Sequence, residues 1–222
     1  MEKLKFAHRG LHSKKNGIPE NSMAAFERAV HRGYGIELDV RLSADGVPVV
    51  FHDRTLNRMT GADGEIESMR LNELKRLTLD GGKCRIPTLC EVLRLVNGRV
   101  PLLIEIKSGL LPFTLMRRVM RCLRGYRGRI MIQSFNPLAL LWLRVNAAHI
   151  TRGQLAHKKR WYDIARFFAK PHFVAYDINE INPRLSKALK KKKIPLLCWN
   201  IDIENEKDRK KSCRLCDGMI FE

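Results

Sequence analysis

GIELDV, residues 35–40, has the apolar character of a strand buried inside a sheet, yet it carries two carboxylates. Side chains along a strand alternate between its two faces, so Glu37 and Asp39 point to the same side. Burying one charge is costly, and burying two like charges together is worse unless a partner compensates them. The segment therefore predicts a central strand with a polar site beside it.

Seven other segments share this apolar character, and the connections between them are mostly amphipathic. Val, Ile, Leu and Phe dominate these segments, which is typical of parallel strands covered on both faces. Together with 35–40, the predicted strands are 4–8 (LKFAH), 102–107 (LLIEIK), 130–135 (IMIQSF), 150–155 (ITRGQL), 173–178 (FVAYDI), 194–200 (IPLLCWN) and 217–222 (DGMIFE).

The connections carry helical patterns. In NSMAAFERAVHRG (21–33), Asn21 or Ser22 can cap the start of a helix, and Gly33 stands where a helix stops. Further helices are predicted near 88–96, 111–123, 137–146, 163–170, 183–193 and 203–211.

Eight strands that alternate with helices predict the α/β class and a (β/α)8 TIM-type barrel. A doubly wound open sheet is the alternative on pattern alone. No repeat or linker divides the chain, so we expect residues 1–222 to form a single domain. GVPVVFHD (46–53) has the pattern of an extra strand. Residues 46–86 are therefore expected to form a cap-like insertion after the second strand, on the face where barrels keep their chemistry.

The composition is that of a globular protein, with 45% hydrophobic and 29% charged residues. No apolar run is long enough to span a bilayer, and the start of the chain lacks an apolar signal region. A cytoplasmic location is therefore expected, and six scattered cysteines fit a reducing compartment. Cys213 and Cys216 form a lone C-x-x-C without nearby histidines, which argues against a zinc site.

The chain is strongly basic, with 42 Lys and Arg against 23 Asp and Glu and a net charge of +19. This excess favours anionic partners such as phosphate esters, acidic membranes or nucleic acid. The segment HKKRWYDIARFFAK (157–170) combines positive charge with aromatic residues and leaves open a membrane- or nucleic-acid-binding module. An amphipathic barrel helix with its aromatics packed inward is the favoured interpretation.

A third carboxylate, Glu105, lies in IEIK (104–107) and shares one strand face with Lys107. Because the carboxyl ends of barrel strands meet at one mouth, Glu37, Asp39 and Glu105 are expected to converge there. Their oxygens suit a hard divalent cation, Mg²⁺ or Ca²⁺, whose charge would offset theirs. On spacing alone, the alternative is pairing with the nearby cations Arg9, Arg41 or Lys107.

Two histidines stand at the ends of predicted strands. His8 ends the first strand and precedes Arg9, and His52 ends GVPVVFHD. One imidazole can take a proton from a nucleophile while the other gives one to a leaving oxygen. Arg9 and a metal would hold phosphate oxygens, so the combination indicates phosphodiester cleavage.

Several motifs occur in a fixed order along the chain. They are HRG (8–10), PEN (19–21), GIELDV (35–40), DGVPVVFHD (45–53), IPTLCEVL (86–93) and IEIK (104–107), followed by the weaker IQSF (132–135), CWNID (198–202) and CDGMI (216–220). Together they closely resemble the glycerophosphodiester phosphodiesterase family over nearly the whole chain. The resemblance implies a TIM-type barrel with a small cap and a divalent cation.

By this resemblance each candidate residue receives a role. It implies that His8 and His52 are the catalytic acid–base pair, that Glu37, Asp39 and Glu105 bind the metal, and that Arg9 and Lys107 bind phosphate. Glu20 and Asn21 match a pair that borders the site, and Trp199 matches an aromatic residue near the substrate. For these three, a helix N-cap and a core tryptophan are the structural alternatives.

The implied reaction is hydrolysis of a glycerophosphodiester to sn-glycerol 3-phosphate and an alcohol. A vicinal glycerol hydroxyl is a better placed nucleophile than free water, which favours a cyclic phosphate that water then opens. A phospholipase D-like lyase, which stops at the cyclic phosphate, is the rival enzyme. GLLPFTL (109–115) places Leu110, Leu111 and Phe113 near the site, where they could meet the apolar tail of a lysophospholipid or a membrane surface. The alternative is that they begin the buried face of the next helix.

Two departures from the family pattern stand out. Asp202, three residues after Trp199, stands where the family usually has Asn, and the chain stops at MIFE, where relatives usually continue into a last helix. Without that helix, the outer side of strand 217–222 is expected to be an uncovered apolar groove. The sequence therefore predicts a homodimer that buries the groove, or a chain of lowered stability.

Overall fold

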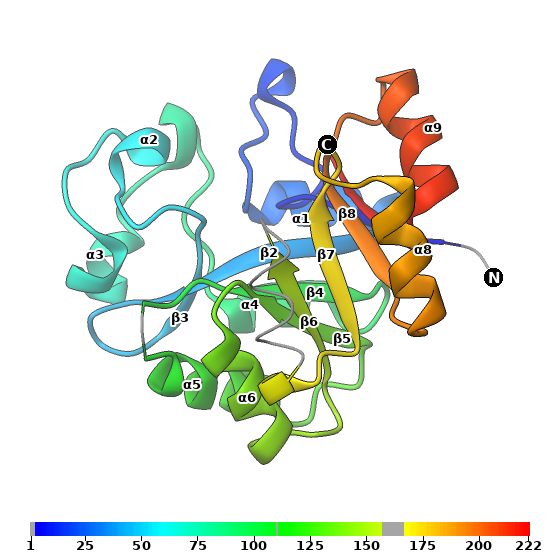
Figure 1. Ribbon diagram of the computed structural model, residues 1–222. Helices are drawn as coiled ribbons and strands as arrows, with labels where there is room; N and C mark the ends of the chain where they lie inside the picture. Colours follow the sequence, from blue (N-terminus) through cyan, green and yellow to red (C-terminus); the bar gives the residue numbers. More distant parts are fainter. Residues whose placement is uncertain (1–2, 110, 157–166) are drawn as a thin grey trace.

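The computed structural model describes residues 3–109, 111–156 and 167–222, and its centre is a closed barrel of parallel strands (Figure 1). β1 pairs with both β2 and β9, which closes the ring and excludes the open doubly wound sheet. The predicted (β/α)8 TIM-type fold is confirmed. The barrel strands are β1 (Leu4–Ala7), β2 (Gly35–Leu42), β4 (Leu102–Ile106), β5 (Ile130–Ser134), β6 (Thr151–Ala156), β7 (Phe173–Asp177), β8 (Leu196–Ile201) and β9 (Gly218–Phe221).

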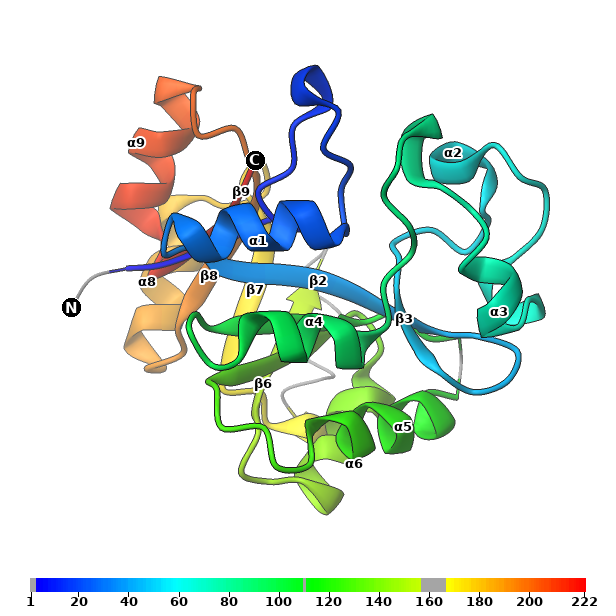
Figure 2. The same cartoon turned by 180° about the vertical axis from the view of Figure 1, so that it is seen from behind.

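Helices cover the outside of the barrel, as Figures 1 and 2 show. Ser22, rather than Asn21, caps the first of them, because its side chain accepts a hydrogen bond from the N–H of Ala25 at 3.2 Å. The helix predicted at 163–170 falls largely outside the described residues. Phe167 and Phe168 are described and are 76% and 53% exposed, so the expectation that its aromatics pack inward is wrong for these two. The outer helices are α1 (Met23–His31), α4 (Leu89–Val96), α5 (Phe113–Leu123), α6 (Pro137–Asn146), α8 (Pro183–Lys191) and α9 (Glu206–Leu215).

The interior of the barrel is filled by side chains. Phe6, Leu103, Met131, Leu155, Phe173, Ala175, Leu197 and Ile220 form one buried cluster. Because side chains alternate along a strand, Glu105 and Gln133 point inward one layer above Leu103 and Met131. The apolar plug therefore confines polar chemistry to the carboxyl-end mouth.

The segment between β2 and α4 has its own small core. β3 (Pro48–Val50) runs antiparallel to β2, and Val40 is opposite Val50. The helices that follow are α2 (Asn57–Thr60), η2 (Ile66–Ser68), α3 (Leu71–Leu74) and η3 (Leu79–Gly81). Figure 1 shows α2 and α3 apart from the barrel, on the side toward which β2 and β3 extend. The cap-like insertion predicted over 46–86 is thus held together by buried residues such as Phe51, Leu56, Ile66 and Leu79.

The outer face of β9 is not an uncovered groove, so that expectation is wrong. Met219 and Phe221 are only 3% and 2% exposed. The ring of Tyr34, just beyond α1, contacts Phe221 edge-on at 5.0 Å between ring centroids. Leu215, at the end of α9, belongs to the same buried cluster, although the sequence of α9 is mostly charged. The apolar side chains of β9 are therefore buried within the chain itself.

Among the described residues, no helix is long and apolar enough to cross a membrane.

Candidate active site

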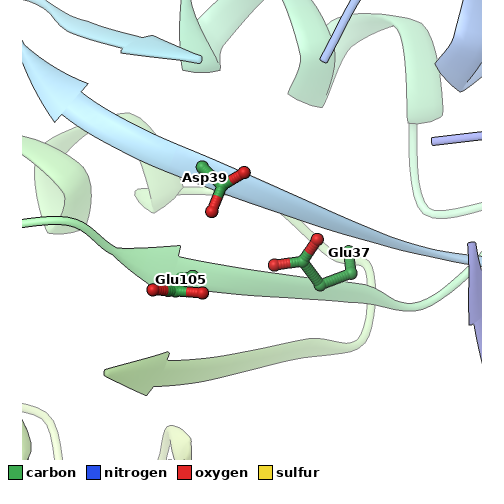
Figure 3. Close-up of side chains that lie close together, drawn as sticks. All are labelled: Glu37, Asp39 and Glu105. Carbon is green, nitrogen blue, oxygen red and sulfur yellow. The ribbon is translucent and has the colours of Figure 1, made fainter. Parts of the chain in front are cut away.

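Three buried carboxylates meet at the mouth of the barrel. Glu37 and Asp39 come from β2 and Glu105 from β4, where Asp39 and Glu105 are direct neighbours in the strand register. Each offers a carboxylate oxygen within 4.8 Å of the others, and Figure 3 shows the three side chains close together on the two neighbouring strands. They are 1%, 1% and 6% exposed. The predicted convergence is therefore present in the structure.

The positive charge around these carboxylates is unevenly shared. Lys107 Nζ lies 2.6 Å from Glu105 and 3.3 Å from Asp39, and Arg9 Nε lies 3.5 Å from Asp39. Burial opposes the ionisation of Asp39, but Lys107, His52 and Arg9 outweigh it and lower its pKa. Arg41, the third candidate cation, instead donates to Glu67 at 3.4 Å and to the carbonyl of His52 at 2.9 Å.

Glu37 is the carboxylate that these cations leave least compensated. Burial and the neighbouring charge of Asp39 raise its pKa to about 8. Burial likewise raises the pKa of Glu105 in spite of Lys107. A cluster that holds its charge so reluctantly, built from hard oxygen ligands, fits a divalent cation. The ion pairs that the sequence left open do form, at Glu105 and Asp39, and the three carboxylates still lie close enough together to fit a cation.

His8 lies directly beyond β1, with its backbone N–H bonded to the carbonyl of Phe221 at 2.9 Å. Its Nδ1 lies 2.7 Å from Glu222 Oε1. Burial disfavours a charged imidazole here, but the hydrogen bond with Glu222 and the charge of Glu37 outweigh burial and raise the pKa of His8. Glu222 was not predicted as a site residue. Its position could have indicated a site residue, because it directly follows a barrel strand and lies two residues beyond Ile220, which faces the inside of the barrel.

His52 comes from the segment that follows β3. Its Nδ1 lies 2.6 Å from Asp53 Oδ1. Burial lowers the pKa of His52, with the charges of Lys107 and Arg9 adding to this effect against Asp39 and Asp53. Each histidine therefore has its own carboxylate partner on Nδ1, but the pKa values of the two are shifted in opposite directions.

An ion-pair network ties the cap to the barrel beside these histidines. Arg58, on α2, bonds Asp53 at 2.5 Å and Glu20 at 2.7 Å. Glu20 also accepts from Arg9 at 2.8 Å. Asp53 and Arg58 were missed by sequence reasoning, because nothing in the order of residues shows that the cap folds back onto the loop after β1.

Asn21 bonds to the carboxylate cluster rather than capping the helix. Its side-chain N–H donates to Asp39 at 2.9 Å, and its backbone N–H donates to the carbonyl of Arg9 at 2.8 Å. Asn21 and Arg9 both have positive φ, at 52° and 54°, which is uncommon for residues other than glycine. Such backbone strain is typical of functional sites, where neighbouring contacts hold it in place.

A cleft of about 200 Å³ joins these groups. It is lined by His8, Arg9, Glu37, His52, Glu105 and Lys107, and also by Gln133, Phe135, Trp199 and Asn200. Trp199 therefore borders the cleft, and its ring packs edge-on against Phe135 at 6.3 Å. Among the described residues, no hydrogen-bond partner reaches the buried side-chain oxygen of Gln133, which sequence reasoning also missed.

Asp202 is not among the residues that line the cleft. It is exposed, and its carboxylate accepts a hydrogen bond from the N–H of Glu204 at 2.9 Å. Asn200, two residues earlier, lines the cleft instead, and its side-chain N–H donates to the carboxylate of Asp177 at 2.8 Å. The departure at Asp202 therefore shapes a turn after β8.

A mouth with this chemistry suits one class of enzyme, the (β/α)8-barrel phosphodiesterases. The comparison with known families is specific: the model of the glycerophosphoryl diester phosphodiesterase family matches residues 8–222, and the chain belongs to that family. A glycerophosphodiester phosphodiesterase of Caldanaerobacter subterraneus is 35% identical over 234 residues, which cover 99% of this chain and 94% of that protein.

Solved structures agree with this assignment. A phosphodiesterase of Oleispira antarctica, in complex with the product sn-glycerol-3-phosphate, has a TM-score of 0.88 and 26% identity, and the match covers 98% of this chain and 92% of its own. A glycerophosphodiester phosphodiesterase of Thermotoga maritima has a TM-score of 0.81 and 27% identity, over 100% and 95% of the two chains. The chain is therefore a glycerophosphodiester phosphodiesterase.

Proposed function

We propose that this enzyme hydrolyses glycerophosphodiesters to sn-glycerol 3-phosphate and an alcohol, with a divalent cation held by Glu37, Asp39 and Glu105. The observation that carries the proposal is the convergence of three buried carboxylates beside two histidines in one cleft. A cation bound there supplies Lewis-acid polarisation of the phosphate and offsets its negative charge. Assays with each ion decide between Mg²⁺ and Ca²⁺.

The residues of the chain divide the remaining work. The guanidinium of Arg9 and the ammonium of Lys107 bind phosphate oxygens. One of the histidines, His8 or His52, takes the proton of the substrate's neighbouring glycerol hydroxyl, which attacks phosphorus as the bond to the alcohol breaks. The other gives a proton to the departing oxygen. Water then attacks the cyclic phosphate and opens it, with the acid and base roles of the two histidines exchanged.

A tethered hydroxyl supports the cyclic route, because intramolecular attack avoids the entropy cost of bringing in a second molecule. The rival phospholipase D-like lyase would use the same groups and release the cyclic phosphate. Phosphorus NMR of the product distinguishes the two: a cyclic ester that persists supports the lyase, and accumulation of sn-glycerol 3-phosphate supports the hydrolase.

A substrate panel tests the proposal directly. Glycerophosphocholine, glycerophosphoethanolamine and glycerophosphoglycerol would be assayed with Mg²⁺, with Ca²⁺ and in excess chelator. We expect turnover of at least one substrate with metal and its loss in chelator. Full turnover in excess chelator would overturn the role assigned to Glu37, Asp39 and Glu105.

A substrate with an apolar tail is a second, narrower proposal. A groove of about 580 Å³ continues from the catalytic cleft, with which it shares Lys107 and Phe135, and reaches Pro137 and Leu138 at the start of α6. This volume lies within the range of small-molecule sites. Leu111 is 69% exposed nearby, Phe113 is 36% exposed, and Leu110 lies outside the described residues. We propose that the groove accepts the acyl chain of a lysophospholipid.

A further inference from the structure

A hydrogen bond joins His8 at the mouth of the barrel to Glu222, which directly follows β9 and has no role in the mechanism proposed above. His8 Nδ1 lies 2.7 Å from Glu222 Oε1. We propose that Glu222 is a positioning residue, which fixes the orientation and the proton content of His8. This inference rests on the proposed function, because it takes His8 to be one of the two groups that move protons.

The backbone holds Glu222 in place from two sides. Its N–H donates to the carbonyl of Ile201 at 2.8 Å, and its carbonyl accepts from the N–H of Ile203 at 3.1 Å. The parallel pairing of β1 with β9 sets Ala7 opposite Phe221, so the residues that follow these two strands are brought together. The carboxylate is thus presented to His8 by the barrel itself.

The chemistry follows from which imidazole nitrogen is engaged. An imidazole whose Nδ1–H donates to a carboxylate has its tautomer and ring orientation fixed, and Nε2 is left for exchange with a substrate oxygen. The side chain of Glu222 is 52% exposed. Its pKa is lowered to about 2, first by the hydrogen bond with His8, so it stays ionised at neutral pH.

Other charges face His8, and they do not replace Glu222. Glu37 and Asp39 favour its protonated form, Arg9 opposes it, and His12 titrates nearby. A cation at the carboxylate cluster would offset Glu37 and Asp39, which leaves Glu222 to support the charge on His8. The equivalent partner of His52 is differently placed, because Asp53 is shared with the guanidinium of Arg58.

The test compares Glu222→Gln, Glu222→Ala and Glu222→Asp with the control Glu204→Gln. Glu204 is an exposed carboxylate of the neighbouring turn, so its change removes the same charge without touching His8. An NMR titration of the histidine rings, with His8→Ala to assign the signal, gives the pKa of His8. The pH profile of kcat/KM is measured on glycerophosphocholine.

We expect Glu222→Gln to lower the pKa of His8, to move the matching limb of the pH profile in the same direction, and to reduce kcat about 10- to 100-fold. Glu222→Ala, which also loses the acceptor, should be slower still. Glu222→Asp should recover part of the pH profile because it keeps the charge. Glu204→Gln should leave both measurements unchanged.

An unchanged pKa of His8 in both Glu222→Gln and Glu222→Ala would overturn the inference, and so would rates equal to those of Glu204→Gln. Since Glu222 is half exposed, its truncation leaves no buried cavity, and circular dichroism checks the fold of each variant. Failure of the proposed function is a different result: the wild type would then hydrolyse no phosphodiester, while the titration would still decide whether Glu222 controls His8.

Discussion

At the scale of single residues, Glu37 shows most clearly how position decides chemistry. It is buried beside Asp39, and its pKa is raised from 4.5 to about 8. In the unfolded chain the same carboxyl ionises near its ordinary value, so it binds fewer protons than the folded state between these two pH values. Without metal, the stabilising contribution of protonated Glu37 is therefore present below pH 4.5 and is lost as pH rises toward about 8.

This linkage predicts how metal stabilises the protein. A cation competes with the proton on Glu37, so the rise in Tm caused by Mg²⁺ or Ca²⁺ should be larger at pH 8 than at pH 5. Differential scanning fluorimetry in metal and in chelator measures this difference. Glu37→Gln should weaken metal binding and flatten the dependence. A metal-induced shift that is the same at every pH would contradict the role of Glu37.

The two histidines of the cleft give a second prediction at this scale. His8→Ala and His52→Ala should each reduce kcat by about 10²- to 10⁴-fold, because each removes a positioned acid or base. Both side chains lie at the mouth rather than in the apolar core, so the fold should persist by circular dichroism. Near-native turnover in either variant, where chemistry limits the rate, would show that its role is misassigned.

At the scale of elements, Arg58 connects α2 of the cap to the loop after β1. It binds Asp53, the partner of His52, and Glu20, the partner of Arg9. We expect Arg58→Ala to lower kcat about tenfold through His52 while changing the free energy of unfolding little, since Arg58 is 47% exposed. The matched control is Arg54→Ala, whose side chain is 69% exposed and pairs with Glu65 in the cap. Equal kcat in the two variants would argue against coupling between cap and site.

Substitutions on α6 test whether the apolar groove binds the tail of a substrate. Each methylene buried there should raise kcat/KM up to about fourfold, so a soluble hexanoyl lysophosphatidylcholine should exceed glycerophosphocholine by at least about tenfold. Leu138→Asp, in the groove, should remove most of this ratio. Val145→Asp, on the same helix but 74% exposed outside the groove, should keep it. Equal rates on both substrates in the wild type would count against a preference for a tail.

At the scale of the whole molecule, the net charge of +19 and the exposed lysines of α8 and its end, Lys187 and Lys190 to Lys193, favour acidic surfaces. We expect binding to vesicles rich in phosphatidylserine, little binding to phosphatidylcholine vesicles, and loss of binding between about 0.1 and 1 M salt. Co-sedimentation measures this. Binding that salt does not weaken would point to insertion of apolar side chains such as Leu111 instead.

The buried outer face of β9 also changes the expectation for assembly. The predicted homodimer rested on an apolar groove, and Met219 and Phe221 are instead covered by Tyr34 and the outer core. This face therefore gives no hydrophobic reason to dimerise. Light scattering across a dilution series remains the test of the homodimer.

The sequence by itself determined the eight barrel strands and the convergence of Glu37, Asp39 and Glu105. Both follow from local rules, because apolar runs define buried strands and a period of two sets which side chains share a face. The histidines were found for the same reason, since they end strands whose carboxyl ends meet.

The tertiary structure alone decided the partners of those residues. Glu222 reaches His8 across 214 positions of sequence, and Arg58 reaches Glu20 across 38. Such contacts depend on how the ring closes and how the cap folds back. The covering of β9 by Tyr34 is of the same kind: an aromatic side chain distant in sequence fills a space that local patterns leave undefined. Hydrogen bonds and packing between distant segments are set by three-dimensional closure, which residue order does not show.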